Sequence, residues 1–141
     1  MKRIMLYFLF LATTGFADSF VLENQTSYPN QKQKSKIAIQ WASSVKEVND
    51  ANTALMNGLK LNAKTLQMLK QIGTLNLNIP KKAEYFRVVA WSTGDGEPDF
   101  VTNWVDVVPD KTYTLETDHL VPSVLMQGTG CYSKNLKSST D

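Results

Sequence analysis

Short segments in which apolar residues alternate with polar or small ones recur along the chain, and this pattern constrains the fold most. A period of two residues is typical of β-strands with one face in a core. The segments predicted as strands are 18–26, 36–43, 74–79, 84–92, 100–108, 111–117 and 123–127. About seven short strands separated by turn residues predict an antiparallel β-sandwich, because strands in a parallel sheet would alternate with helices.

The period changes between the second and third predicted strands. Ser44 and Glu47 have the spacing of a capping box and predict a helix over 44–57. The alternative is a loop followed by a strand at 53–61. Apolar residues at helical spacing over 62–73 predict a further short amphipathic helix. The predicted fold class is therefore mainly β (α+β), with one or two short helices inserted between strands 2 and 3.

Residues 1–17 have the pattern of a secretory signal peptide. Lys2 and Arg3 precede a mostly apolar run over 4–16, and Ala17 ends a small-residue cleavage site. The apolar run is too short to cross a bilayer as a helix, which takes about 20 residues. We therefore expect cleavage after Ala17, export to the periplasm or the extracellular space, and no transmembrane segment in the mature chain.

Charge and cysteine content limit the function classes of the expected mature chain. Without Lys2 and Arg3 it has 13 basic and 13 acidic residues, so it lacks the excess of positive charge typical of nucleic-acid binding. Its single cysteine, Cys131, is expected to be either a free thiol or an intermolecular disulfide that would give a homodimer. The predicted domain covers 18–132, and the polar residues 133–141 are expected to form a disordered tail.

The loop STGDGEPDF places Asp95, Glu97 and Asp99 at alternate positions. Carboxylates with this spacing are one way to begin a calcium site, so these three residues are the candidate metal ligands. The loop departs from a helix–loop–helix calcium site because Phe100 stands where a glycine is needed. A solvated hairpin turn, in which glycines supply positive φ, is the favoured interpretation.

Aromatic side chains on the strand predicted over 84–92 are the candidate ligand-binding residues. Tyr85, Arg87 and Trp91 share one face of that strand. This face is either a second apolar layer or an exposed platform on which a sugar or peptide stacks, with Arg87 as its polar anchor. Trp104 on the next predicted strand presents the same choice.

No catalytic motif accompanies the single histidine, His119. Pairing with Cys131 would give a small cysteine hydrolase, but neither residue lies in a nucleophile motif. We expect no cofactor. The leading hypothesis is a small exported, non-enzymatic β-sandwich that binds a protein partner. A carbohydrate- or peptide-binding module is the alternative, and the hydrolase is third.

The run from TLNLNIPKKAEYFRVVAW (74–91) to NWVDVVP (103–109) is similar in strand patterning to the transthyretin-like sandwiches of bacterial envelope complexes, which include the outer-membrane lipoprotein of type VI secretion systems. The similarity covers about half of the chain. That family carries a lipidated cysteine, whereas no cysteine directly follows the apolar run here. No residue role is carried over from this resemblance.

Overall fold

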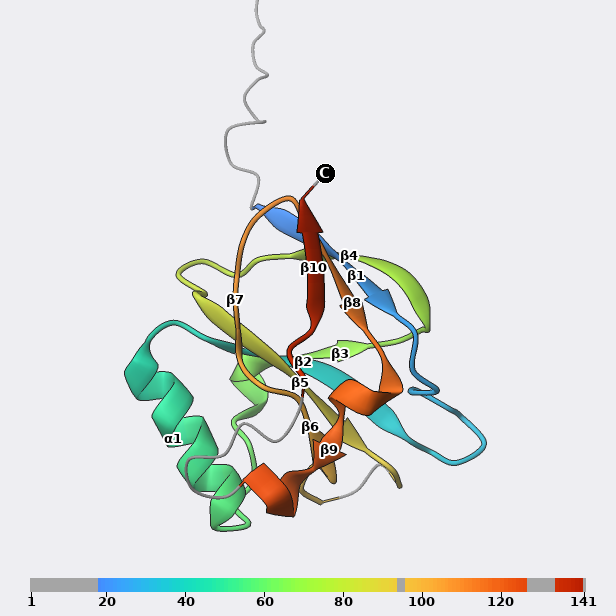
Figure 1. The fold of residues 1–141 in the computed structure, drawn as a ribbon. Helices are drawn as coiled ribbons and strands as arrows, with labels where there is room; N and C mark the ends of the chain where they lie inside the picture. The colour runs from blue at the N-terminus through green and yellow to red at the C-terminus, as the bar shows by residue number, and fades with distance from the viewer. Residues whose placement is uncertain (1–17, 94–95, 127–133, 141) are drawn as a thin grey trace, which may run out of the picture.

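The structure is a computed structural model that describes residues 18–93, 96–126 and 134–140. In these residues the chain forms two β-sheets, one α-helix and three short 3₁₀ helices (Figure 1). No helix in these ranges is both long enough and apolar enough to cross a membrane.

The first sheet has the strand order β10-β8-β1-β4. Its strands are β1 (Ser19–Asn24), β4 (Gly73–Asn78), β8 (Lys111–Leu115) and β10 (Lys137–Thr140). β1 pairs antiparallel with β4 and parallel with β8, and β10 pairs antiparallel with β8. The β1–β8 pair is the one departure from the predicted antiparallel pairing among the described strands.

The second sheet has the strand order β3-β2-β5-β6-β9, and β7 also pairs with β5. Its strands are β2 (Lys36–Ala42), β3 (Leu66–Leu69), β5 (Tyr85–Trp91), β6 (Phe100–Val101), β7 (Val105–Asp106) and β9 (Val121–Pro122). β2 and β5 pair along their whole lengths in the middle of this sheet, from Lys36 opposite Trp91 to Ala42 opposite Tyr85.

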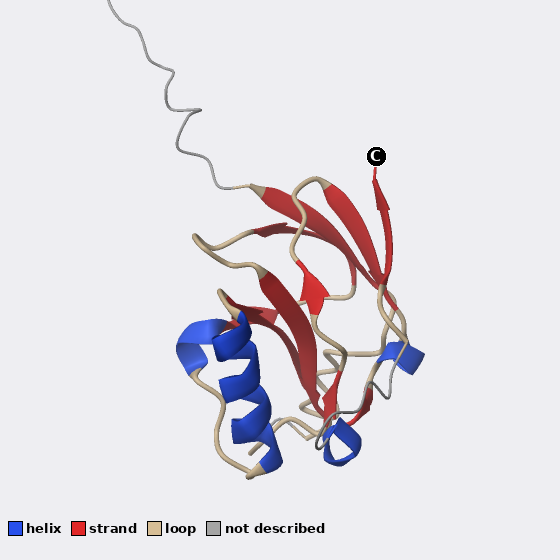
Figure 2. Cartoon of the chain, turned by 60° about the vertical axis from the view of Figure 1, so that its left-hand side comes forward, coloured by secondary structure: helices blue, strands red, loops and turns tan. Residues whose placement is uncertain are grey.

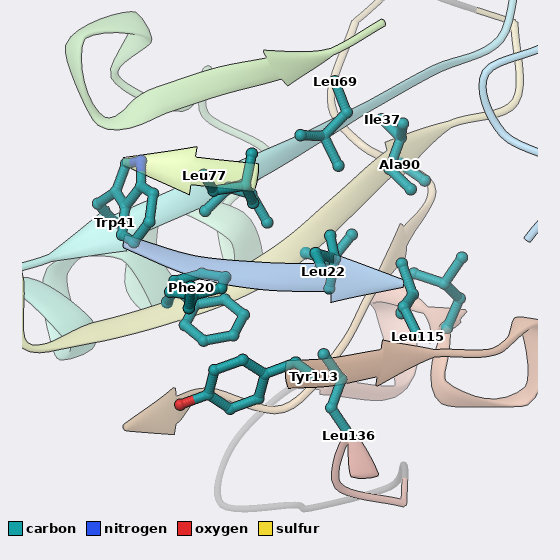
Figure 3. Packing of buried hydrophobic residues seen from close by; sticks show 14 of the residues in the cluster. Phe20, Leu22, Ile37, Trp41, Leu69, Leu77, Ala90, Tyr113, Leu115 and Leu136 are labelled. Carbon is teal, nitrogen blue, oxygen red and sulfur yellow. The ribbon is translucent and has the colours of Figure 1, made fainter. Parts of the chain in front are cut away.

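The main hydrophobic core lies between the two sheets. Phe20 on β1 stacks on Phe86 of β5, with ring centroids 4.9 Å apart, and meets the Tyr113 ring of β8 edge-on at 5.0 Å. Figure 3 shows Phe20 and Tyr113 among the apolar side chains of this cluster. The two sheets therefore pack face to face, which confirms the predicted mainly β fold class with a helix after the second strand.

Helix α1 (Val45–Met56) lies on the outer face of the second sheet (Figure 2). Its first turn confirms the predicted cap, because the Ser44 hydroxyl accepts a hydrogen bond from the Glu47 amide at 3.2 Å. The Glu47 carboxylate accepts from the Ser43 amide at 2.8 Å, one residue before the expected partner. A smaller apolar cluster fills the space under the helix: Ala38, Leu55, Leu61, Val89, Trp91 and Val101.

The predicted second helix over 62–73 is wrong. Asn62 does cap a first turn, since its side-chain oxygen accepts from the Lys64 amide at 3.0 Å, but the turn is only the 3₁₀ helix η2 (Ala63–Thr65). The chain then enters β3, which pairs with β2 and buries Leu69 in the main core. Pairing with a neighbouring strand outweighs the local helical spacing of the leucines.

The strand predicted over 100–108 is broken into β6 and β7. At Thr102 the side chain takes the place of the backbone carbonyl as the acceptor for β5, because the Thr102 hydroxyl accepts from the Val88 amide at 2.9 Å. The same hydroxyl donates to the Asn103 carbonyl at 2.9 Å. The strand predicted over 123–127 is also wrong where it is described, because residues after β9 form the 3₁₀ helix η4 (Ser123–Met126).

The predicted disordered tail is corrected over its described part. Residues 137–140 form β10, which extends the first sheet beside β8. Leu136 is buried in the main core immediately before this strand. One apolar side chain in a polar segment thus anchors an edge strand that composition alone does not reveal.

Candidate binding groove beside helix α1

The structure places the predicted aromatic face of β5 under helix α1. Phe86, Val88 and Ala90 face the main core, whereas Val89 and Trp91 belong to the cluster under the helix. Arg87 is 1% exposed and Trp91 is 7% exposed. This face is therefore a second buried layer, and Arg87 and Trp91 do not form an open platform. Tyr85 and Trp104 are half-buried.

Arg87 is held by three side chains from different elements. Its Nε donates to Gln40 Oε1 of β2 at 2.7 Å, and its Nη1 donates to Asn52 Oδ1 of α1 at 3.0 Å. The guanidinium carbon lies 4.6 Å from the centroid of the Trp104 ring, which is a cation–π contact. Trp104 Nε1 donates to the same Asn52 oxygen at 2.9 Å.

The charge of Arg87 has no carboxylate partner among the described residues, where the ion pairs involve only lysines. Its Nη2 is buried without a hydrogen bond. Burial lowers the pKa of Arg87 to about 9, so the guanidinium is still charged at neutral pH. A buried cation therefore lies between the second sheet and α1, stabilised by amide oxygens and an aromatic ring rather than by an opposite charge.

A groove runs along α1, on the side of the segment that precedes β3. Its first part is a cleft of about 300 Å³ between α1 and residues 60–65, with Gln40, Trp41 and Leu61 among its lining residues. Its second part is a depression of about 240 Å³ bounded by residues 80–83. We call the two parts together the α1 groove. The two parts adjoin each other, because Trp41, Glu47 and Thr65 line both.

The acidic and basic side chains of the α1 groove differ in their pairing. Asp50 is bound to Lys46 at 2.9 Å, and the Ser43 amide holds the pKa of Glu47 below its ordinary value. Four exposed lysines also line the groove, and in the described part of the chain none of them forms an ion pair: Lys60, Lys64, Lys81 and Lys82. Glu47 keeps its negative charge, and the net charge left available to a ligand is therefore positive.

The loop of the calcium candidates has the contacts of a turn. Asp99 accepts hydrogen bonds from the amide and the hydroxyl of Ser92, both at 2.7 Å, and Trp91 Nε1 donates to the Gly96 carbonyl at 2.9 Å. Asp95 lies outside the described residues, so the three-carboxylate calcium site stays a prediction. The Asp99 carboxylate, a candidate calcium ligand, is therefore used to connect the two ends of the loop through Ser92.

His119 is buried at the end of the 3₁₀ helix η3 (Thr117–His119). Its Nδ1 accepts from the Glu116 amide at 2.9 Å. Glu116 and Asp118 lie close enough to His119 to form a metal-ligand cluster, but both carboxylates pair with lysines of the C-terminal segment, at 3.5 Å to Lys137 and 3.2 Å to Lys134. These contacts connect η3 to the segment that leads into β10.

Cys131 lies outside the described residues, so both its pairing with His119 and an intermolecular disulfide stay predictions. Sequence reasoning missed Gln40 and Asn52, the two residues whose oxygens hold Arg87. Their positions on one strand and one helix carry no local signal, because the contact depends on how α1 packs on the sheet. Comparisons with known proteins add no assignment: no protein-family model matches the chain, and no curated protein matches its sequence.

Proposed function

We propose that this chain is a small exported, non-enzymatic β-sandwich protein that acts by binding a protein partner through the α1 groove. The observation that carries the proposal is the groove itself, a concave surface with an apolar floor and exposed lysines that no described acid neutralises. Concave surfaces with an apolar lining and a few convergent polar groups are typical of binding sites.

Two further features support this proposal. The signal-peptide pattern of residues 1–17 supports export. The one described histidine and the two carboxylates beside it are engaged in structural contacts: His119 caps a turn, and Glu116 and Asp118 pair with lysines. The geometry of this cluster therefore favours a structural role over an acid–base reaction, and the groove remains the candidate site.

A site-specific photo-crosslinking experiment in the native host tests the proposed function. The photoreactive residue replaces Asn62, which is exposed and lines the groove, and a control replaces Asn76, which is exposed on β4. We expect Asn62 to capture a protein that Asn76 does not capture. The captured protein is then purified and titrated against the unmodified chain by calorimetry. Failure to capture any protein from either position, in any cell fraction, would contradict the proposal.

A further inference from the structure

We propose that the α1 groove binds an extended acidic segment of the partner, in which carboxylate and apolar side chains alternate. This inference rests on the proposed function and adds the chemistry of the ligand. Three features of the molecule support it: the two adjoining parts of the groove, its net positive charge and the buried cation behind its floor.

The shape of the groove fits an extended chain. Trp41, whose ring packs against Phe20 and Phe86 of the main core, is 8% exposed and lines both the cleft beside residues 60–65 and the depression beside residues 80–83, so the two parts of the groove meet at this residue. Trp41 is fixed there because its Nε1 donates to Gln67 Oε1 at 3.3 Å. Two depressions that share one fixed residue fit successive side chains from one face of an extended peptide.

The exposed charges select an acidic ligand. Lys60 lies at the cleft, and Lys64, Lys81 and Lys82 lie at the second depression. Asp50 pairs with Lys46, whereas Glu47 keeps its negative charge although it accepts from the Ser43 amide, so four unpaired lysines face one unpaired acid of the groove lining. Carboxylates from a partner are therefore the groups that would complete this set of charges.

The buried cation, Arg87, also favours an acidic ligand. Gln40 lines the cleft, and its side-chain oxygen accepts from Arg87 Nε, so its amide –NH₂ is the polar group that it still has for a ligand. Arg87 lies behind Gln40 and is 1% exposed. Its charge is not paired with any carboxylate of the described residues. In a medium of low dielectric constant its field reaches the floor of the groove and favours an anion there.

The apolar part of the groove lining favours a ligand that also carries apolar side chains. Trp41, Ala54 and Leu61 contribute apolar surface between the lysines and the helix. A purely acidic segment would leave this surface without contacts. A segment that alternates carboxylate and aliphatic side chains places the first toward the lysines and the second on Trp41 and Leu61.

The test is a titration of the full chain with a decapeptide of alternating aspartate and valine, blocked at both ends. The readout is the indole N–H resonance of Trp41 in nitrogen-15 NMR spectra. We expect this resonance to shift with saturation, and binding to weaken with added salt because exposed charges are screened. A matched asparagine–valine peptide is expected to bind at least roughly tenfold more weakly. Equal binding of the two peptides would overturn the inference.

Two triple variants localise the effect. Lys64→Glu, Lys81→Glu and Lys82→Glu reverse charges in the groove. Lys32→Glu, Lys34→Glu and Lys36→Glu make the same change of net charge at exposed positions in the segment that leads into β2 and at its first residue. Each set contains one residue with positive φ, 68° at Lys82 and 57° at Lys34, so the two sets match in backbone strain. We expect the groove set to lose roughly tenfold or more in affinity and the control set to lose little. Equal losses would overturn the assignment to the groove.

The outcomes separate this inference from the proposed function. If the aspartate–valine peptide does not bind while Asn62 captures a protein, the function stands and the acidic chemistry is wrong. If the peptide binds in the groove while no position captures a protein, the acidic site stands and the protein-partner function is wrong. If neither occurs, both fail.

Discussion

The second sheet is covered on its two faces by layers of different chemistry. On the inner face, aromatic and aliphatic side chains pack against the first sheet, with Phe20 and Phe86 stacked at 4.9 Å. On the outer face, the layer under α1 contains a charged guanidinium held by Gln40 and Asn52. Apolar packing is non-directional, whereas the outer layer depends on directed hydrogen bonds.

This difference separates the part of the molecule that holds the fold from the part that shapes the groove. Leu55 is the one residue of α1 that is buried, so the helix is attached by little apolar surface. Its polar contact to the sheet runs from Asn52 to Arg87. We therefore expect the inner layer to determine global stability and the outer layer to determine the position of α1.

The largest expected effect is in the inner layer. Phe20→Ala removes a ring that is 1% exposed and contacts both Phe86 and Tyr113. It should lower the free energy of unfolding by about 3–5 kcal/mol, because a cavity replaces the ring. Urea denaturation measures the change. Val21→Ala, on the other face of β1, is the control and should cost less than about 1 kcal/mol. Equal costs would contradict the assignment of the main core.

The next effect tests the directed contacts of the outer layer. Asn52→Ala removes the oxygen that accepts from both Arg87 Nη1 and Trp104 Nε1. The loss should be about 2–3 kcal/mol, because a buried charge and an indole N–H each lose a partner. Asn49→Ala is the matched control, since Asn49 is exposed on the same helix. If both variants are equally stable in urea, the Arg87 contacts contribute nothing to the layer.

The two layers also differ in how far sequence predicts them. Alternation in β1, β2, β4 and β5 predicted these strands within a few residues, because burying one face of a strand in the core produces that period. The prediction was wrong for 62–73, where pairing with β2 decides the structure. It was also wrong at β10, whose residues carry a polar sequence and gain their order from pairing with β8.

The outer layer was only partly predictable. The two-residue period of the strand predicts that Arg87 and Trp91 share one face. Whether this face is a buried layer or an exposed platform is decided by where α1 packs, which the period does not show. Asn52 and Gln40 have no sequence signal, because their role comes from meeting Arg87 across two elements. The α1 groove is likewise formed by segments that are distant in sequence, Gln40, residues 60–65 and residues 80–83.

A smaller effect should be confined to α1. Ser44→Ala removes the cap that accepts from the Glu47 amide, and the loss should be about 1 kcal/mol. Amide hydrogen exchange should accelerate in the first turns of α1 while amides in β2 and β5 remain protected, because the helix adds little to the inner layer. Thr53→Ala, an exposed change in the same helix, is the control. Faster exchange throughout both sheets would mean that the two layers unfold as one unit.

The smallest expected change at neutral pH comes from removing the buried charge itself. Arg87→Met keeps an unbranched side chain in the layer and removes the cost of burying a guanidinium without a carboxylate. Gln40 Oε1 loses one donor, which offsets part of this gain, and Asn52 keeps its bond from Trp104. Urea denaturation should therefore give a stability within about 1 kcal/mol of the wild type. A larger loss than that of Asn52→Ala would mean that the charge is compensated.

The pH dependence of this pair of proteins sharpens the contrast between the layers. Burial lowers the pKa of Arg87 to about 9, below its value in the unfolded chain, so between the two values the unfolded state binds more protons. Stability of the wild type should therefore rise relative to Arg87→Met as the pH increases through about 9, by about 1 kcal/mol between about pH 8 and about pH 10. Comparing the two proteins at each pH removes the titration of lysines and tyrosines that they share. A constant difference would show that Arg87 stays protonated in the folded protein throughout this range, and the outer layer would then hold its cation without the penalty that distinguishes it from the inner core.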